Sequence, residues 1–159
     1  MNATHHTVTA LVQNESGTIN RVVSLFRRRG FSLASFNAGD CEQPGFSRMT
    51  FVVEGDRATV GQVLKQLDRL IDVVACEDLP EESSVARELA LVKLAPSPDQ
   101  RKALYGLVLE HYAKTPSANE SFVIVEFAGS VAEVETLIER LAPYNVVEVV
   151  RTGLVAIGL

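Results

Sequence analysis

Residues 6–30 read "HTVTALVQNESGTINRVVSLFRRRG", and the architecture of the first half of the chain can be worked out from them. Val8, Ala10 and Val12 fall on one face of an extended segment, which predicts a strand. The polar turn "NESG" follows, and apolar residues then recur at the spacing i, i+3, i+4 and i+7, which predicts a helix ending at Gly30. The apolar positions of this helix are Ile19, Val22, Val23 and Phe26.

The segments that follow repeat this alternation of strands and helices. Residues 32–40 and 47–55 are strand-like and are joined by a turn at Pro44-Gly45, and residues 72–78 supply the last strand. The order βαββαβ predicts an α+β, ferredoxin-like unit with both helices on one face of an antiparallel sheet. The stripe of the second helix consists of Val60, Val63, Leu64, Leu67 and Ile71.

Such a sheet has one face without helices. Leaving apolar side chains exposed there costs about 25 cal/mol for each Å² of apolar area that is not buried. Small units of this type often bury that area by pairing, either edge to edge or face to face. We therefore expect a homodimer.

An acidic connection at residues 77–84, interrupted by Pro80, predicts a domain boundary. We divide the chain into residues 1–79 and 80–159, and the second part resembles a looser βαββαβ-type unit of the same α+β class. Its predicted elements are a strand at 85–96, a helix at 97–112, a strand at 121–129, a helix at 130–142 and a terminal strand at 145–159.

Composition excludes several classes of protein. The chain has 159 residues and a formal net charge of −5, which argues against a general nucleic-acid binder. It lacks the roughly 20 consecutive apolar residues of a membrane span, no secretory signal is expected, and with two cysteines a cytoplasmic setting is expected. The basic run Arg27–Arg29 is interpreted either as a solvated helix end that complements the helix dipole or as a contact with a partner protein.

Motifs for catalysis or metal binding are absent from the sequence. His5 and His6 are neighbours in a strand and point to opposite faces, so they do not form a simple metal site. His111 lies on a predicted helix, and Cys41 has no base adjacent to it in the sequence. We expect no catalytic and no metal-binding residues, unless residues distant in the sequence converge in space.

The turn "NESG", residues 14–17, is the one candidate binding element. The first N–H groups of the following helix have no intrahelical partner and carry partial positive charge. Gly17 has no Cβ to obstruct an anion, Asn14 offers a side-chain amide, and Ser16 is placed to cap the helix. Simple capping explains the same residues, and backbone physics leaves both interpretations open.

Four segments of the chain carry a resemblance to a known family. They read "NESGTINRVVSLFRRRGFSLASF", "SRMTFVVEGD", "ARELALVKL" and "VVEVVRTGLVAI", in this order. The chain resembles the small regulatory subunit of acetolactate synthase, also called acetohydroxyacid synthase. The resemblance implies an N-terminal ACT domain at 1–79, a C-terminal α+β domain at 80–159, and a homodimer in which the ACT domains pair.

The resemblance also implies a function without chemistry of its own. In this family the small subunit binds the catalytic subunit, raises its activity and confers inhibition by a branched-chain amino acid, usually valine. Thiamine diphosphate, FAD and magnesium belong to the catalytic subunit. We therefore expect none of these cofactors to be bound by this chain itself.

The family's effector site maps onto the turn and onto a residue of a second copy. The family stretch "RG[YF]N", which supplies an asparagine from the partner subunit, appears here with serine at its last position. A hydroxyl offers one donor whereas an amide offers two, and one lost hydrogen bond to a charged group costs roughly 1.5–3 kcal/mol, about 10- to 150-fold in affinity. The implied effector residues are Asn14, Glu15, Ser16, Gly17, Ile19 and Ser32.

A free-standing ACT-type module that regulates another enzyme or a transcription factor is the alternative. It is disfavoured because the resemblance continues through "ARELALVKL" and "VVEVVRTG", well beyond one ACT domain. A small enzyme on this fold has no supporting motif. An RNA-binding sheet lacks both the net charge and the stacking aromatic residues.

Overall fold

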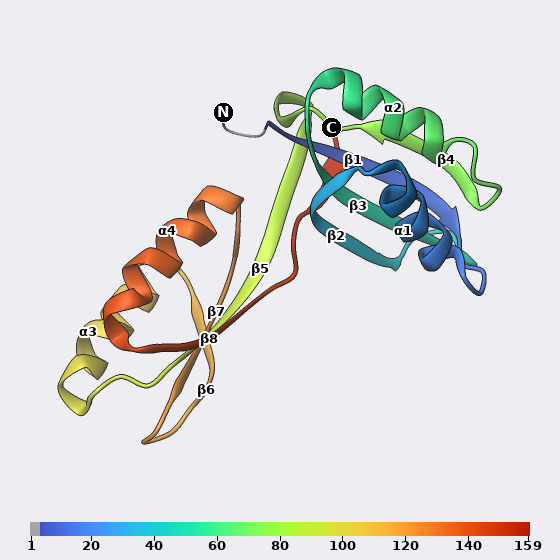
Figure 1. The fold of residues 1–159 in the computed structure, drawn as a ribbon. Coiled ribbons are helices and arrows are strands. Elements are labelled where there is room, and N and C mark those ends of the chain that lie inside the picture. The colour runs from blue at the N-terminus through green and yellow to red at the C-terminus, as the bar shows by residue number, and fades with distance from the viewer. Residues whose placement is uncertain (1–3) are drawn as a thin grey trace. The chain divides into compact units, whose positions relative to one another are not determined.

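The computed structural model of the chain describes residues 4–159, which form two compact units (Figure 1). The first unit comprises the described residues up to Ala86 together with Leu154–Leu159, and the second comprises Arg87–Gly153. The division expected from the sequence, 1–79 and 80–159, differs from these units in two places. The first unit extends past the acidic connection, and it also takes back the last residues of the chain.

The first unit is a four-stranded antiparallel sheet in the order β2-β3-β1-β4, with two helices. The predicted ferredoxin-like arrangement is confirmed. Its elements are β1 (His5–Gln13), α1 (Thr18–Arg29), β2 (Ser32–Asp40), β3 (Phe46–Glu54), α2 (Arg57–Leu67) and β4 (Val73–Asp78).

Both helices pack against the same face of this sheet. Val22 and Phe26 of α1 and Val63 of α2 share one core with Val8 of β1 and Phe51 of β3. The rings of Phe26 and Phe51 stack with their centroids 5.1 Å apart. Apolar positions with helical and strand periods therefore meet in one layer, as the sequence pattern predicts.

The predicted buried stripe of α1 is wrong at two positions. Ile19 and Val23 are 51% and 42% exposed, whereas Thr18 and Leu25 are buried. Thr18 tolerates burial because its hydroxyl donates a hydrogen bond to the Gln13 carbonyl at 3.0 Å. The inward face of α1 therefore differs from the face that hydrophobicity alone predicts.

The helix-free face of the first sheet is partly covered by the chain itself. Strand β9 (Val155–Gly158) contacts β1, and the Leu154 amide donates to Ser35 Oγ at 3.4 Å. Thr9 and Thr50, which pair across β1 and β3 on this face, are each 5% exposed. The uncovered apolar area of this face, from which we expect a homodimer, is therefore smaller than the sequence suggested.

The second unit also has the βαββαβ order, with sheet order β6-β7-β5-β8. Strand β6 was not predicted from the sequence, because its residues "KTPSA" are polar and include a proline, a residue that is tolerated on an edge strand. Residues 145–159 were predicted to be one strand, but the extended conformation is interrupted near Gly153, which has φ 75°. The elements are β5 (Ser84–Leu94), α3 (Arg101–Glu110), β6 (Lys114–Ala118), β7 (Val123–Gly129), α4 (Val131–Leu141) and β8 (Val146–Arg151).

Asp56 caps the N-terminus of α2. Its Oδ1 accepts hydrogen bonds from the Thr59 amide at 2.8 Å and from the Thr59 hydroxyl at 2.7 Å. These bonds hold the pKa of the Asp56 carboxyl below its ordinary value. A carboxyl whose pKa is depressed by folding adds stability above its unfolded pKa, and that stability is lost as the pH falls through the folded pKa.

Asp56→Ala is expected to lower the melting temperature by roughly 4–8 °C at pH 7, and the difference from wild type should shrink below about pH 4. Asp56→Asn is the matched control, because asparagine keeps a capping acceptor but has no charge to titrate. Thermal melts of the three proteins from pH 7 to pH 3 measure both effects. A deficit of the alanine variant that stays constant over this range would contradict the assignment.

Candidate functional site

The turn at residues 14–17 connects β1 to α1 on the surface of the first unit. Gly17 is the N-cap residue of α1 and adopts φ 87°, a left-handed conformation that favours glycine. No side chain caps this helix, so the prediction that Ser16 caps it is wrong. The reason is geometric, since the helix begins one residue later than a Ser16 cap requires.

The first turn of α1 presents unused backbone donors. The Thr18 amide donates to the Glu15 carbonyl at 3.1 Å, and the Arg21 amide donates to the Gly17 carbonyl at 2.9 Å. Within residues 4–159, no acceptor is found for the amides of Ile19 or Asn20. The first turn contains no acidic residue. Two free N–H groups at the positive end of a helix suit a carboxylate or another small anion.

An arginine that the sequence analysis overlooked stands beside these amides. Arg21 Nε donates to Asp72 Oδ2 at 2.5 Å, and its Nη2 lies 3.5 Å from Thr18 Oγ1. Its Nη1 lies 3.1 Å from the point that a Cβ at Gly17 would occupy. The hydrogen bond to Asp72 raises the pKa of the Arg21 guanidinium. A guanidinium that is paired with the Asp72 carboxylate therefore lies beside Gly17 and Thr18, at the start of α1.

Asp72 also ties the turn to the rest of the sheet. Its side chain is 7% exposed while that of Arg21 is 44% exposed, so the pair is anchored from the buried side. The Asp72 carbonyl accepts from the Gln13 amide at 2.8 Å, and the Asn14 amide donates to the Gly45 carbonyl at 2.8 Å. The turn is thus held by the segment before β4 and by the β2–β3 connection.

Comparison with known proteins identifies the family. Residues 8–75 match the family described as "AHAS small subunit-like ACT domain", and residues 87–159 match "Small subunit of acetolactate synthase". The probable acetolactate synthase small subunit of Archaeoglobus fulgidus is 39% identical over 151 residues, which is 95% of this chain and 94% of that protein. The chain belongs to the acetolactate synthase small subunit family.

Two further family members support this assignment. The acetolactate synthase small subunit of Bacillus subtilis is 38% identical over 94% of this chain and 87% of its own length. The crystal structure of the small subunit from Thermotoga maritima matches with a TM-score of 0.92 and 34% identity, covering 98% of both chains. The family and the α+β fold with an N-terminal ACT domain, both expected from the sequence, are confirmed.

The structure brings five of the six predicted effector residues together. Asn14, Glu15, Ser16 and Gly17 are exposed in the turn, and Ile19 follows them with its side chain 51% exposed. Their role in binding an effector stays a prediction. The free amides and the guanidinium of Arg21 give this small-subunit turn an anion-binding character that its side chains alone do not have.

The sixth predicted residue, Ser32, does not lie at this turn. It begins β2, beyond the far end of α1, a helix of 12 residues and therefore about 18 Å long. Its Oγ donates to Glu54 Oε2 at 2.8 Å, and β2 is an edge strand of its sheet. Ser32 and the turn therefore form one site only if Ser32 comes from a second copy of the chain.

The histidines and cysteines are placed as follows. His6 Nε2 is buried and has no hydrogen-bond partner among residues 4–159, and His5 Nε2 lies 3.7 Å from Glu54 Oε1. His111 Nε2 lies 2.8 Å from Arg140 Nη1.

The two cysteines do not form a disulfide. Within residues 4–159, no group of three or more His, Cys, Asp or Glu side chains is arranged to hold a metal ion. None of the described helices is long and apolar enough to cross a membrane.

Asp72→Ala tests the support beneath the turn. The substitution removes a hydrogen bond between charged groups, and solvent screening of the half-exposed Arg21 limits the loss of stability. The variant should therefore melt several degrees below wild type. A thermal melt checks this. Asp68→Ala is the control, because it removes the carboxylate of an exposed aspartate at the C-terminal end of α2. Equal melting temperatures for the two variants would contradict a supporting role for the Arg21–Asp72 pair.

Proposed function

We propose that this chain is a non-catalytic regulatory subunit that binds the catalytic subunit of acetolactate synthase in the cytoplasm and raises its activity. We further propose that it mediates feedback inhibition by a branched-chain amino acid, with valine as the first candidate. The observation that carries the regulatory part is the turn at residues 14–17, with two free amides and Arg21 beside it. Thiamine diphosphate, FAD and magnesium would belong to the catalytic partner.

The turn matches the chemistry of a free amino acid. The carboxylate of the effector would accept hydrogen bonds from the amides of Ile19 and Asn20, near the positive charge of Arg21. The missing side chain at Gly17 leaves the Arg21 guanidinium free to lie against the turn. The exposed side chain of Ile19 offers an apolar contact to an aliphatic side chain, and the Asn14 amide adds a polar group.

A second copy would complete the site. Ile19 and Val23 leave apolar area exposed on α1, and β2 lies at the edge of its sheet, where another strand can pair with it. Pairing of two ACT domains through this edge would bury both features. In such a homodimer, Ser32 of one copy would approach the turn of the other. The effector would then stabilise the dimer interface that it helps to form.

Regulation requires that the effector distinguish two states of the complex. A ligand shifts an equilibrium only by its difference in affinity for the two states. If valine lowers the activity of the complex, it must bind the inhibited state more tightly, and a coupling of 1–3 kcal/mol is typical of allosteric proteins. The free-standing ACT module is not favoured by any feature of the site, and both halves of the chain match small-subunit families.

Reconstitution tests this proposal. The chain is mixed with the catalytic acetolactate synthase subunit of its own organism, and complex formation and the rate of acetolactate formation are measured together. A stable complex with a higher rate than the catalytic subunit alone is the expected result. Absence of both a complex and activation would overturn the proposal.

A further inference from the structure

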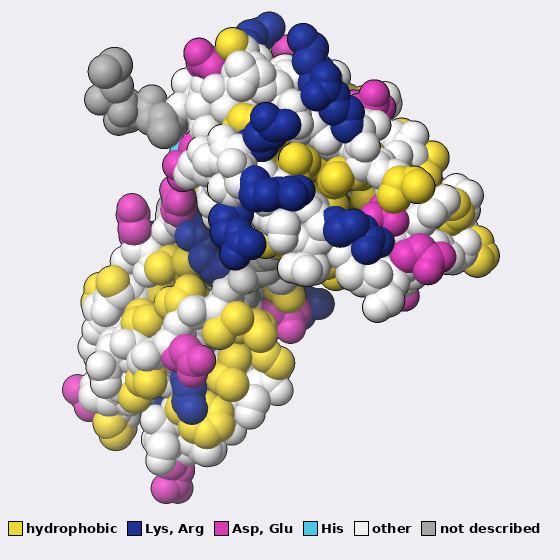
Figure 2. Space-filling model, turned by 45° about the vertical axis from the view of Figure 1, so that its right-hand side comes forward, with side chains coloured by type: hydrophobic (Ala, Val, Ile, Leu, Met, Phe, Trp, Pro, Cys, Tyr) yellow, Lys and Arg dark blue, Asp and Glu magenta, His cyan; other side chains and the backbone are white. Residues whose placement is uncertain are grey.

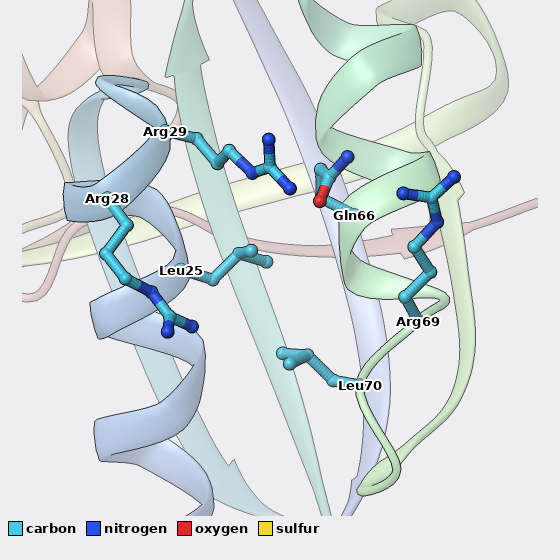
Figure 3. A pocket seen from close by; sticks show the side chains of 6 residues that line it. All are labelled: Leu25, Arg28, Arg29, Gln66, Arg69 and Leu70. Carbon is cyan, nitrogen blue, oxygen red and sulfur yellow. The ribbon is translucent and has the colours of Figure 1, made fainter.

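A hollow of about 450 Å³ lies on the outer side of the first unit, between α1 and α2. Figure 3 shows its lining, in which Arg29 reaches from α1 toward Gln66 of α2, and Leu25 and Leu70 lie below. This hollow is at the C-terminal end of α1, whereas the turn at residues 14–17 precedes its N-terminus. It is lined by Leu25, Arg28, Arg29, Gln66, Arg69 and Leu70.

Three arginine side chains line this hollow. Within residues 4–159, Arg28, Arg29 and Arg69 form no ion pair and no hydrogen bond, whereas Arg21 and Arg48 are each paired with a carboxylate. None of the described residues that line the hollow is acidic. The chain as a whole has a net charge of −5. Positive charge is nevertheless concentrated on this face (Figure 2).

The helix dipole accounts for only part of this arrangement. Arg28 and Arg29 lie in the last turn of α1, where cations are favoured. The carbonyls of Arg27 and Phe26 are already capped, however, by the amides of Gly30 and Phe31 at 3.3 Å and 3.0 Å. A helix end carries about half an elementary charge, so the ends of both helices offset about one of the three guanidinium charges.

We propose that this hollow binds a multivalent oxyanion of the phosphate type, either free pyrophosphate or the diphosphate group of a larger ligand. The planar fork of arginine donates two parallel hydrogen bonds to such oxygens, and each of the three arginines that line the hollow can supply such a fork. The Gln66 amide adds a neutral donor. The leucines at the base exclude water from beneath the anion, which strengthens the electrostatic attraction. The site is independent of the regulatory proposal.

Titration of the full-length protein with inorganic pyrophosphate tests the inference. Calorimetry at constant ionic strength, with chloride as the compensating anion, should show saturable binding. Arg29→Gln and Arg69→Gln should each weaken this binding roughly tenfold or more. Arg27→Gln is the matched control, because it removes the same charge from the same helix turn at a position outside the lining. All three residues are exposed, so the variants should fold like wild type.

Three results would overturn the inference. The first is the absence of saturable binding to the unmodified protein. The second is an equal loss in Arg27→Gln and Arg29→Gln, which would indicate diffuse attraction and no built site. The third is a weaker complex with the catalytic subunit in Arg29→Gln and Arg69→Gln without any pyrophosphate binding, which would make this face a protein-docking surface.

Discussion

Ser32→Asn is expected to tighten valine binding by roughly 10- to 150-fold. Ser32 has a single donor, and this hydroxyl already donates to Glu54 at 2.8 Å. An asparagine amide has two donors and one acceptor, so it can keep the bond to Glu54 and still offer a donor to an effector bound at the turn of a second copy. The unmodified protein should therefore respond to valine only weakly.

Melting curves measured with valine, leucine and isoleucine on both proteins give this result directly, because a ligand that binds only the folded state raises the melting temperature according to its affinity. Ser32→Ala serves as the control, since it removes the hydroxyl and adds no donor. It should bind no more tightly than wild type. Tight valine binding by the unmodified protein would show that Ser32 is no handicap.

Gly17→Ala is expected to remove the response to valine. Gly17 has φ 87°, where an L-residue costs roughly 1–2 kcal/mol. A Cβ at this position would lie 3.1 Å from Arg21 Nη1, closer than ordinary contact, so the guanidinium beside the free amides of α1 would have to shift. The position of the guanidinium relative to these amides should therefore change.

The same melting series measures this second effect, and Gly30→Ala is its matched control. Gly30 also has a positive φ, 69°, but a Cβ there would meet no atom of the described part of the chain within 4 Å. The two variants should lose similar stability, and only Gly17→Ala should lose the valine-dependent rise. A similar rise in both would contradict the location of the site at this turn.

Much of the fold follows from the sequence because its decisive patterns are local. The strand before residue 14, the helix after residue 17 and the turn at Gly45 each depend on neighbours within a few positions. Strand β6 was missed because its residues are polar and its pairing with β7 is set by tertiary context. The return of β9 to the first unit was missed for the same reason, since it depends on residues more than 60 positions away.

The candidate site was predictable to a similar degree. The turn and Gly17 stand out in the sequence because a strand, a glycine and a helix follow one another. The pairing of Arg21 with Asp72 does not, because 51 positions separate the two residues. Arg69 was overlooked for the same reason, although the run Arg27–Arg29 was noticed. Ser16 was wrongly assigned as a cap because serine and glycine are both common at helix starts, and geometry alone decides between them.

The rate of acetolactate formation by the reconstituted complex, measured against valine concentration, tests the central claim most directly. With the wild-type chain, the complex should be faster than the catalytic subunit alone and should be inhibited by valine. With Gly17→Ala, the complex should be equally fast in the absence of valine but should resist inhibition. Equal inhibition of the two complexes, or no activation by either chain, would contradict the account.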